Sequence, residues 1–196
     1  AYALCDSLSP IARETGNVNT LLRRRDGSIF GDNTDAFGFR YLLEKAGVPV
    51  AGKRALVLGA GGAGGTACAV LRQMGAAVTV LSRTEKPDDF YGKNNGILYS
   101  TYRHISQYKD AQIIVNATPV GMYPHNGEAA VDLEIFPKLC LVAVLIYNPA
   151  RTALLLQAED LGIPCSGGLS MLAAQAAASA ALFLGEAMDI SKISQV

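Results

Sequence analysis

A glycine-rich loop stands directly after an apolar, strand-like run and directly before a helical segment. The run RALVLG (54–59) leads into Gly59-Ala60-Gly61-Gly62-Ala63-Gly64-Gly65, which fits G-x-G-x-x-G, and TACAVLRQM (66–74) follows. In a βαβ unit such glycines let the backbone approach a pyrophosphate at the positive end of a helix. The placement favours a dinucleotide site over a merely tight turn. Its expected cofactor-binding residues are Gly59, Ala60, Gly61, Gly62 and Ala63.

Further apolar runs follow this loop and alternate with helical segments. Residues 77–82, 111–118 and 139–147 form clear runs, 97–101 a weak one and 164–166 a short one. Continuous apolar runs of this kind indicate strands buried on both faces of a parallel sheet. The sequence therefore predicts a doubly wound α/β fold of the Rossmann type. The segment KPDDFYGKNNG (86–96) is rich in helix breakers and predicts a short, irregular second crossover.

The first 50 residues have a different pattern. We expect a helix near residues 8–15 and a hairpin in which Asp26-Gly27 joins LLRRR (21–25) to SIFG (28–31). A second helix is expected over about 35–46, and Val48–Gly52 reads as a linker or tight connection before the strand at 54.

Composition excludes several classes of function. The 17 basic residues equal the 17 acidic ones, so no net charge steers nucleic acid or an anionic membrane to the chain. The longest apolar segments, 139–147 and 171–184, are too short to span a membrane, and no signal peptide precedes them. Four separated cysteines and two isolated histidines offer neither a metal motif nor a disulfide framework. A reducing cytoplasm fits this usage.

The end of the second expected strand bears on the choice of cofactor. NAD enzymes usually place an acidic residue there to hold the ribose hydroxyls, whereas this chain offers Ser82, Arg83 and Thr84. A guanidinium suits a 2′-phosphate, which a carboxylate would repel. These three residues favour NADP over NAD, although Glu85 follows at once and could turn toward the ribose.

The stretch GDNTD (31–35) places four short polar side chains at the start of the expected second helix. Asp, Asn and Thr are typical helix caps, yet a cap needs only one of them. From spacing alone, two interpretations stay open. The side chains form either a cap with surplus members or a polar site for a hydroxylated ligand.

Several stretches together resemble the shikimate dehydrogenase family, and they cover nearly the whole chain in the family's order. They are GNVNT (16–20), GDNTDAFGF (31–39), the glycine loop, Ser82-Arg83-Thr84, NATPVGM (116–122), Tyr147-Asn148-Pro149 with Thr152, and GGLSMLAAQA (167–176). The resemblance implies NADP-linked reduction of 3-dehydroshikimate to shikimate, in the route to aromatic amino acids. Quinate dehydrogenase is a related alternative, whereas Gly31–Asp35 with Gln175 argue against a methylenetetrahydrofolate enzyme.

The resemblance also implies roles for individual residues. Asp35 matches the carboxylate that pairs with a catalytic lysine and contacts a substrate hydroxyl, and the other implied substrate-binding residues are Asn19, Tyr147 and Gln175. Beside the glycine loop and residues 82–84, the implied cofactor-binding residues are Asn116, Ala117, Thr118, Pro119, Met122, Gly168 and Met171. No metal is implied.

One family motif is absent from these residues. The family's lysine stands in an N-x-T-x-P-x-K segment, and no such segment occurs here. We therefore expect a Rossmann NADP-binding domain over 35–167, with 1–34 and 168–196 as the remnant of a second, substrate-binding lobe. The chain is expected to bind NADPH but to turn over slowly or not at all alone. Apolar surface left by the missing lobe predicts self-association, for example as a homodimer. A non-catalytic NADP-binding module is the alternative from another class.

Overall fold

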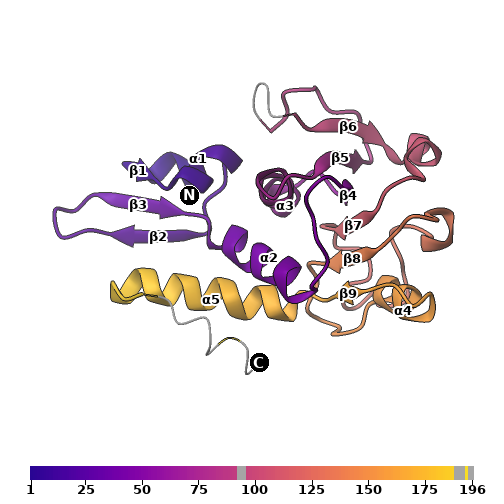
Figure 1. The fold of residues 1–196 in the computed structure, drawn as a ribbon. Helices are drawn as coiled ribbons and strands as arrows, with labels where there is room; N and C mark the ends of the chain where they lie inside the picture. The colour runs from indigo at the N-terminus through magenta and orange to yellow at the C-terminus, as the bar shows by residue number, and fades with distance from the viewer. Residues whose placement is uncertain (92–95, 188–192, 194–196) are drawn as a thin grey trace.

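The computed structural model describes residues 1–91, 96–187 and 193. Its larger sheet runs in the order β6-β5-β4-β7-β8-β9, and every neighbouring pair is parallel (Figure 1). This order is 3-2-1-4-5-6 in chain order, the Rossmann arrangement. The predicted doubly wound fold is confirmed. The strands are β4 (Arg54–Leu58), β5 (Ala77–Ser82), β6 (Leu98–Thr101), β7 (Ile113–Asn116), β8 (Leu141–Val144) and β9 (Cys165–Ser166).

The central strands form because both of their faces are buried. In β4 the side chain of Val57 packs into a core shared with α3 (Gly62–Gln73), whereas Leu56 and Leu58 pack into a second core with α4 (Ala153–Asp160). All four residues of β7 and all four of β8 are buried as well. Helices therefore cover both faces of the sheet, as continuous apolar runs predict.

The crossover between β5 and β6 has no helix within its described residues, 83–91 and 96–97. The predicted irregular crossover is confirmed for these residues, whereas residues 92–95 of the breaker-rich segment lie outside the described part. After β6, the 3₁₀ helix η2 (Tyr102–Tyr108) leads back toward the start of β7. A further 3₁₀ helix, η3 (Leu133–Ile135), precedes β8.

The first 32 residues form a small sheet of order β1-β3-β2, after a short 3₁₀ helix η1 (Tyr2–Leu4). The predicted hairpin is confirmed: β2 (Thr20–Arg23) pairs antiparallel with β3 (Ile29–Asp32), and Gly27 has φ +89° in the turn. The helix expected near residues 8–15 is present as α1 (Pro10–Thr15), but it begins two residues later than expected because Ser7–Leu8 form β1. Ser9 sets this boundary by accepting a bond from the Ala12 amide at 3.2 Å, with Pro10 at the first helical position.

Two long helices, α2 (Thr34–Lys45) and α5 (Leu169–Leu184), pack side by side; α2 lies between the two sheets, and α5 runs beneath the small sheet toward β9 (Figure 1). A Cβ on Gly38 of α2 would lie 2.5 Å from the Met171 carbonyl oxygen, so glycine permits this close approach.

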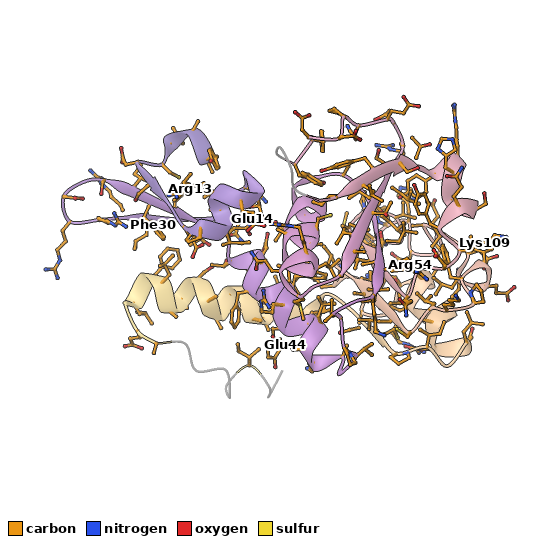
Figure 2. The ribbon with its side chains drawn as sticks, turned by 45° about the horizontal axis from the view of Figure 1, so that its top comes forward. Arg13, Glu14, Phe30, Glu44, Arg54 and Lys109 are labelled. Atoms are coloured by element: carbon orange, nitrogen blue, oxygen red, sulfur yellow. The ribbon has the colours of Figure 1, made fainter. Side chains whose placement is uncertain are left out.

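Glu14 of α1 lies beside α3, where it forms an ion pair with Arg72 (Figure 2). The division into residues 1–34, 35–167 and 168–196 stays a prediction. Among the described residues, no helix is long and apolar enough to cross a membrane.

Candidate functional site: a cofactor cavity and a polar cluster

The glycine loop lies at the carboxyl end of β4, between the carboxyl ends of β5 and β7. Gly59 has φ +103°, Gly61 is the N-cap of α3, and Gly62 and Ala63 are its first residues. A Cβ on Gly59 would lie 2.9 Å from Thr118 Cγ2, and one on Gly64 would overlap the Gly59 carbonyl oxygen. Glycines here allow a close turn of strand into helix, with the amide groups of α3 at the sheet edge where α/β folds bind ligands.

An open cavity of about 810 Å³ lies against this loop. Nine residues expected at the cofactor line it: Gly59, Ala60, Gly61, Ser82, Arg83, Thr84, Ala117, Thr118 and Pro119. The structure thus brings together three segments that lie far apart in sequence. Of the expected residues of the loop, Gly62 and Ala63 are not in the described lining; they are the exposed first residues of α3.

Four further residues line the cavity and were missed from sequence: Lys86, Tyr102, Val120 and Ala130. Lys86 stands three residues after Arg83 and Tyr102 directly after β6, so both positions follow the carboxyl ends of strands. Burial raises the pKa of the Tyr102 phenol, an effect that the positive charge of Arg83 opposes. With Arg83 and Lys86 and no acidic residue in its described lining, the cavity favours an anionic ligand.

Asn116 shapes the cavity wall instead of lining it. Its side chain is fully buried, and its Oδ1 accepts bonds from the Thr118 amide at 3.0 Å and the Thr118 hydroxyl at 2.6 Å. Its Nδ2 donates to the Val120 carbonyl oxygen at 3.1 Å. These bonds fold residues 116–120 into the turn whose backbone faces the glycine loop.

The remaining expected cofactor residues lie away from this lining. Met122 is exposed, whereas Met171 is buried in the core beside Gly38. Gly168 precedes α5, and its amide donates to the Ile146 carbonyl oxygen at 3.0 Å.

A second group of polar residues, the polar cluster, joins β2, α2 and α5. Its members are Asn19, Thr20, Thr34, Asp35, Gln175 and Ser179. The hydroxyls of Thr20, Thr34 and Ser179 lie within 2.9 to 3.2 Å of one another. Gln175 Oε1 accepts from the Thr34 hydroxyl at 3.5 Å. The structure therefore gathers three of the four expected substrate-binding residues, Asn19, Asp35 and Gln175.

The helix cap in this region comes from a distant residue. Asn19 Oδ1 accepts bonds from the Thr34 amide at 2.9 Å and the Thr34 hydroxyl at 3.1 Å, whereas Asn33, the N-cap residue, makes no side-chain cap bond. Asn33 Nδ2 instead donates to Thr15 Oγ1 at 3.0 Å and Thr66 Oγ1 at 2.9 Å. Asn33 thus bonds to α1 and α3, and Thr34 bonds to the residue that precedes β2. The GDNTD segment therefore links several elements, whereas a helix cap requires only one local bond.

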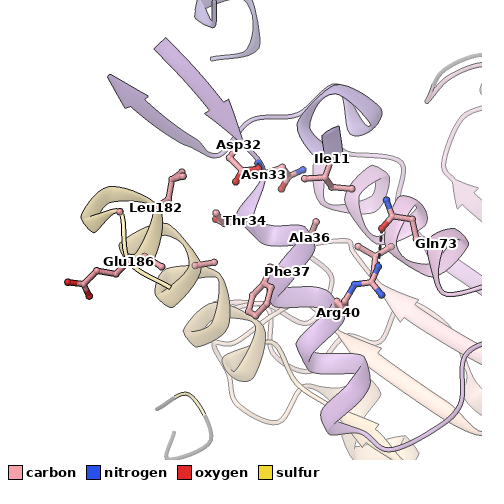
Figure 3. A pocket seen from close by; sticks show the side chains of 14 residues that line it. Ile11, Asp32, Asn33, Thr34, Ala36, Phe37, Arg40, Gln73, Leu182 and Glu186 are labelled. Atoms are coloured by element: carbon pink, nitrogen blue, oxygen red, sulfur yellow. Dashed lines mark hydrogen bonds between the residues drawn. The ribbon is translucent and has the colours of Figure 1, made fainter. Parts of the chain in front are cut away.

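A separate cavity of about 580 Å³ lies at the first turns of α2, with lining residues from α1, α2, α3 and α5 (Figure 3). Thr34 is the one member of the polar cluster among its described lining residues, while Phe37 and Leu182 give it an apolar wall. Asp35 does not line this cavity. The expected substrate residue Tyr147 is also separate, because it lines a small cavity of about 230 Å³ with Lys45 and Ser166.

Asp35 is partly buried at the start of α2. Burial raises the pKa of its carboxyl group, and a side-chain hydrogen bond from Asn19 opposes this rise. The folded chain therefore holds a proton on Asp35 more tightly than the unfolded chain does. The free energy of unfolding falls as the pH rises through the raised pKa, and the full penalty is present above it.

We expect Asp35→Asn to be more stable than the unsubstituted protein at neutral pH. The gain should shrink as the pH falls through the raised pKa toward the ordinary carboxyl value of 3.8, and it should vanish well below 3.8, where Asp35 is neutral in both states. Urea denaturation at pH 7 and pH 4 measures the difference, and Asp89→Asn, at an exposed position, serves as the control. A pH-independent effect of Asp35→Asn would contradict this account of its burial.

Among the described residues, no three His, Cys, Asp or Glu side chains come together as a metal site.

A scan against models of known protein families gave no match. Individual relatives are informative, however. The shikimate dehydrogenase (NADP(+)) of Clostridium perfringens (strain 13 / Type A) is 34% identical over 187 residues, which are 95% of this chain and 69% of that protein. The chain belongs to the shikimate dehydrogenase family.

Solved structures of this family have the same fold. A chorismate mutase/shikimate 5-dehydrogenase fusion protein from Clostridium acetobutylicum superposes with a TM-score of 0.88 at 34% identity, over 98% of this chain and 70% of that one. Shikimate 5-dehydrogenase from Thermus thermophilus, in complex with NADP(H) and shikimate, has a TM-score of 0.85 at 35% identity, over 98% and 72%. The chain thus spans about 70% of these relatives.

Proposed function

We propose that this protein is an NADP-dependent shikimate dehydrogenase that interconverts shikimate and 3-dehydroshikimate, in the route to aromatic amino acids. The observation that carries the proposal is the cavity of about 810 Å³ at the glycine loop, with Arg83 and Lys86 in its lining. Membership of the family and a relative's complex with NADP(H) and shikimate support the same reaction.

NADP fits the proposed cofactor site better than NAD. A 2′-phosphate can form charge-assisted hydrogen bonds with Arg83 and pair with the ammonium group of Lys86. Ser82 and Thr84 add hydroxyl groups at the same edge. Glu85 is outside the described lining, so it does not offer the carboxylate that NAD enzymes use for the ribose hydroxyls.

Asn19, Asp35 and Gln175 are the proposed substrate-binding residues, with Tyr147 as a further member, and Asp35 is the proposed catalytic residue. A small polyhydroxy acid needs several short donors and acceptors, which the polar cluster supplies from β2, α2 and α5. Bound at the glycine loop, NADP⁺ would supply the hydride acceptor for oxidation of the substrate alcohol. The Asp35 carboxylate would hold the substrate hydroxyl and take up the proton that this group loses.

Substrate binding tests this assignment directly. Titration of shikimate into the protein saturated with NADP⁺ should show binding by calorimetry, and Asp35→Asn should weaken it about 10-fold or more, as expected for loss of a hydrogen bond to a charged group. The NADPH affinity of this variant should stay unchanged. Tighter binding of quinate than of shikimate would instead indicate a quinate dehydrogenase.

The proposal also covers the division into domains, self-association and cellular location. Residues 35–167 form the cofactor-binding domain, and 1–34 with 168–196 belong to the substrate-binding lobe, of which 188–192 and 194–196 lie outside the described residues. The exposed Leu172, Phe183 and Leu184 of α5 support self-association as a homodimer. Four free cysteines support a cytoplasmic location. Nucleic acid is not a proposed partner.

A further inference from the structure

Tyr91, in the crossover between β5 and β6, reaches back to the glycine loop. Its hydroxyl donates to the Gly61 carbonyl oxygen at 2.8 Å. Its ring covers the first turns of α3, since a Cβ on Gly65 would lie 2.8 Å from Tyr91 Cε1. A side chain from an irregular segment thus contacts the loop that faces the proposed cofactor site.

The position of Tyr91 is fixed by its neighbours. Its backbone amide donates to the Tyr99 hydroxyl of β6 at 3.1 Å, and the two rings lie 5.9 Å apart. The Phe90 ring lies 5.0 Å from the Tyr91 ring. The rings of Phe90 and Tyr99 therefore hold the phenol where no helix supports the described part of the crossover.

The Tyr91 hydroxyl acts as a donor in this contact. Burial raises the pKa of the phenol, with further rises from the charged forms of Cys68 and Tyr99, so the group keeps its proton at neutral pH. The Gly61 carbonyl oxygen also accepts a bond from the Gly65 amide at 2.9 Å. Two donors thus engage the oxygen of one peptide group.

The orientation of this peptide group matters for an anion. Because a trans peptide is planar, its carbonyl group and the following amide point in opposite directions, so fixing the Gly61 oxygen also fixes the Gly62 amide. Residues 59, 61 and 62 are glycines, whose backbone would otherwise be free to rotate. The Gly61 oxygen points toward the Tyr91 hydroxyl, so the Gly62 amide of the same peptide group points away from the phenol.

We propose that Tyr91 is a positioning residue that holds the Gly61–Gly62 peptide in the orientation needed to bind the cofactor pyrophosphate. This inference rests on the proposed NADP-binding function. Since NADPH and NADH share the pyrophosphate, the effect of Tyr91 extends to both cofactors, in contrast to that of Arg83.

Tyr91→Phe tests the hydroxyl while it keeps the ring over α3. We expect its affinity for NADPH and for NADH to fall equally, by about 3- to 10-fold, the range for one neutral hydrogen bond. Its melting temperature without cofactor should stay close to that of the unsubstituted protein. Tyr108→Phe is the matched control, because Tyr108 ends η2 near the amino end of β7, at the opposite edge of the sheet.

Unchanged affinity of Tyr91→Phe for both cofactors would overturn the inference and leave Tyr91 a packing residue. A loss confined to NADPH would overturn it as well, because the effect would then lie at the 2′-phosphate. If the unsubstituted protein binds neither cofactor, the proposed function fails, and the inference fails with it. Calorimetric titration with each cofactor separates these outcomes.

Discussion

Arg83→Ala lowers the affinity of the protein for NADPH about 10- to 150-fold, the equivalent of about 1.5 to 3 kcal/mol for hydrogen bonds to a charged group. Its affinity for NADH changes little, because NADH has no 2′-phosphate. Arg83 lines the cavity together with Lys86, so the remaining cation retains part of the preference for NADPH. Calorimetric titration with both cofactors measures the change in selectivity.

The matched control for this prediction is Arg103→Ala. Arg103 is an exposed arginine of η2 outside the described lining of the cavity, so its removal changes net charge by the same amount. We expect nearly unchanged affinities for both cofactors in this variant. Equal weakening of NADPH and NADH by Arg83→Ala would contradict the assignment of Arg83 to the 2′-phosphate.

Gly64→Ala disrupts the loop itself. The new Cβ would overlap the Gly59 carbonyl oxygen and lie 3.2 Å from the Tyr91 hydroxyl, so the backbone of the loop or helix must move. Overpacking of this kind costs about 1 to 3 kcal/mol, or roughly 2 to 12 °C in melting temperature for a chain of this size. We expect this loss of stability together with loss of NADPH binding, measured by thermal melts and titration.

Gly61→Ala separates steric crowding from contact with the cofactor. Gly61 has φ −89°, and a Cβ there meets nothing within 4 Å, so alanine fits the folded protein without cofactor. Its side chain would, however, extend from the lining of the cavity. Gly61→Ala should keep the melting temperature of the unsubstituted protein and weaken NADPH binding.

A Gly64→Ala protein that is stable and binds NADPH normally would contradict the close packing of this turn.

The sequence predicted those parts of the fold that depend on local patterns. Apolar runs indicated the parallel strands, and Asp26-Gly27 indicated the hairpin turn, because each signal lies within a few residues. The strand β1 was missed because two residues carry no period, and its pairing with Phe30 and Gly31 is a tertiary contact. The lengths of β7 and β8 were overestimated because an apolar run can continue past the last ladder bond.

The candidate site was predictable where a motif carries it. The glycine loop and Arg83 have fixed places in a Rossmann unit, so their position beside residues 117–119 could be expected. Lys86 and Tyr91 were not predicted, because their positions depend on how an irregular crossover folds back over the sheet edge. Tyr102 was not predicted either, although it directly follows β6. The cap on α2 was also missed, since Asn19 stands 15 residues before Thr34 and reaches it through the β2–β3 hairpin.

The most direct test of the central claim is NADPH formation from shikimate and NADP⁺, followed by NADPH fluorescence on folded protein already shown to bind NADPH. The account predicts a slow signal that requires both shikimate and NADP⁺, is weaker with NAD⁺, and falls further in Asp35→Asn. Tight NADPH binding without any shikimate-dependent signal would contradict it, and would identify these residues as a cofactor-binding module without the chemistry.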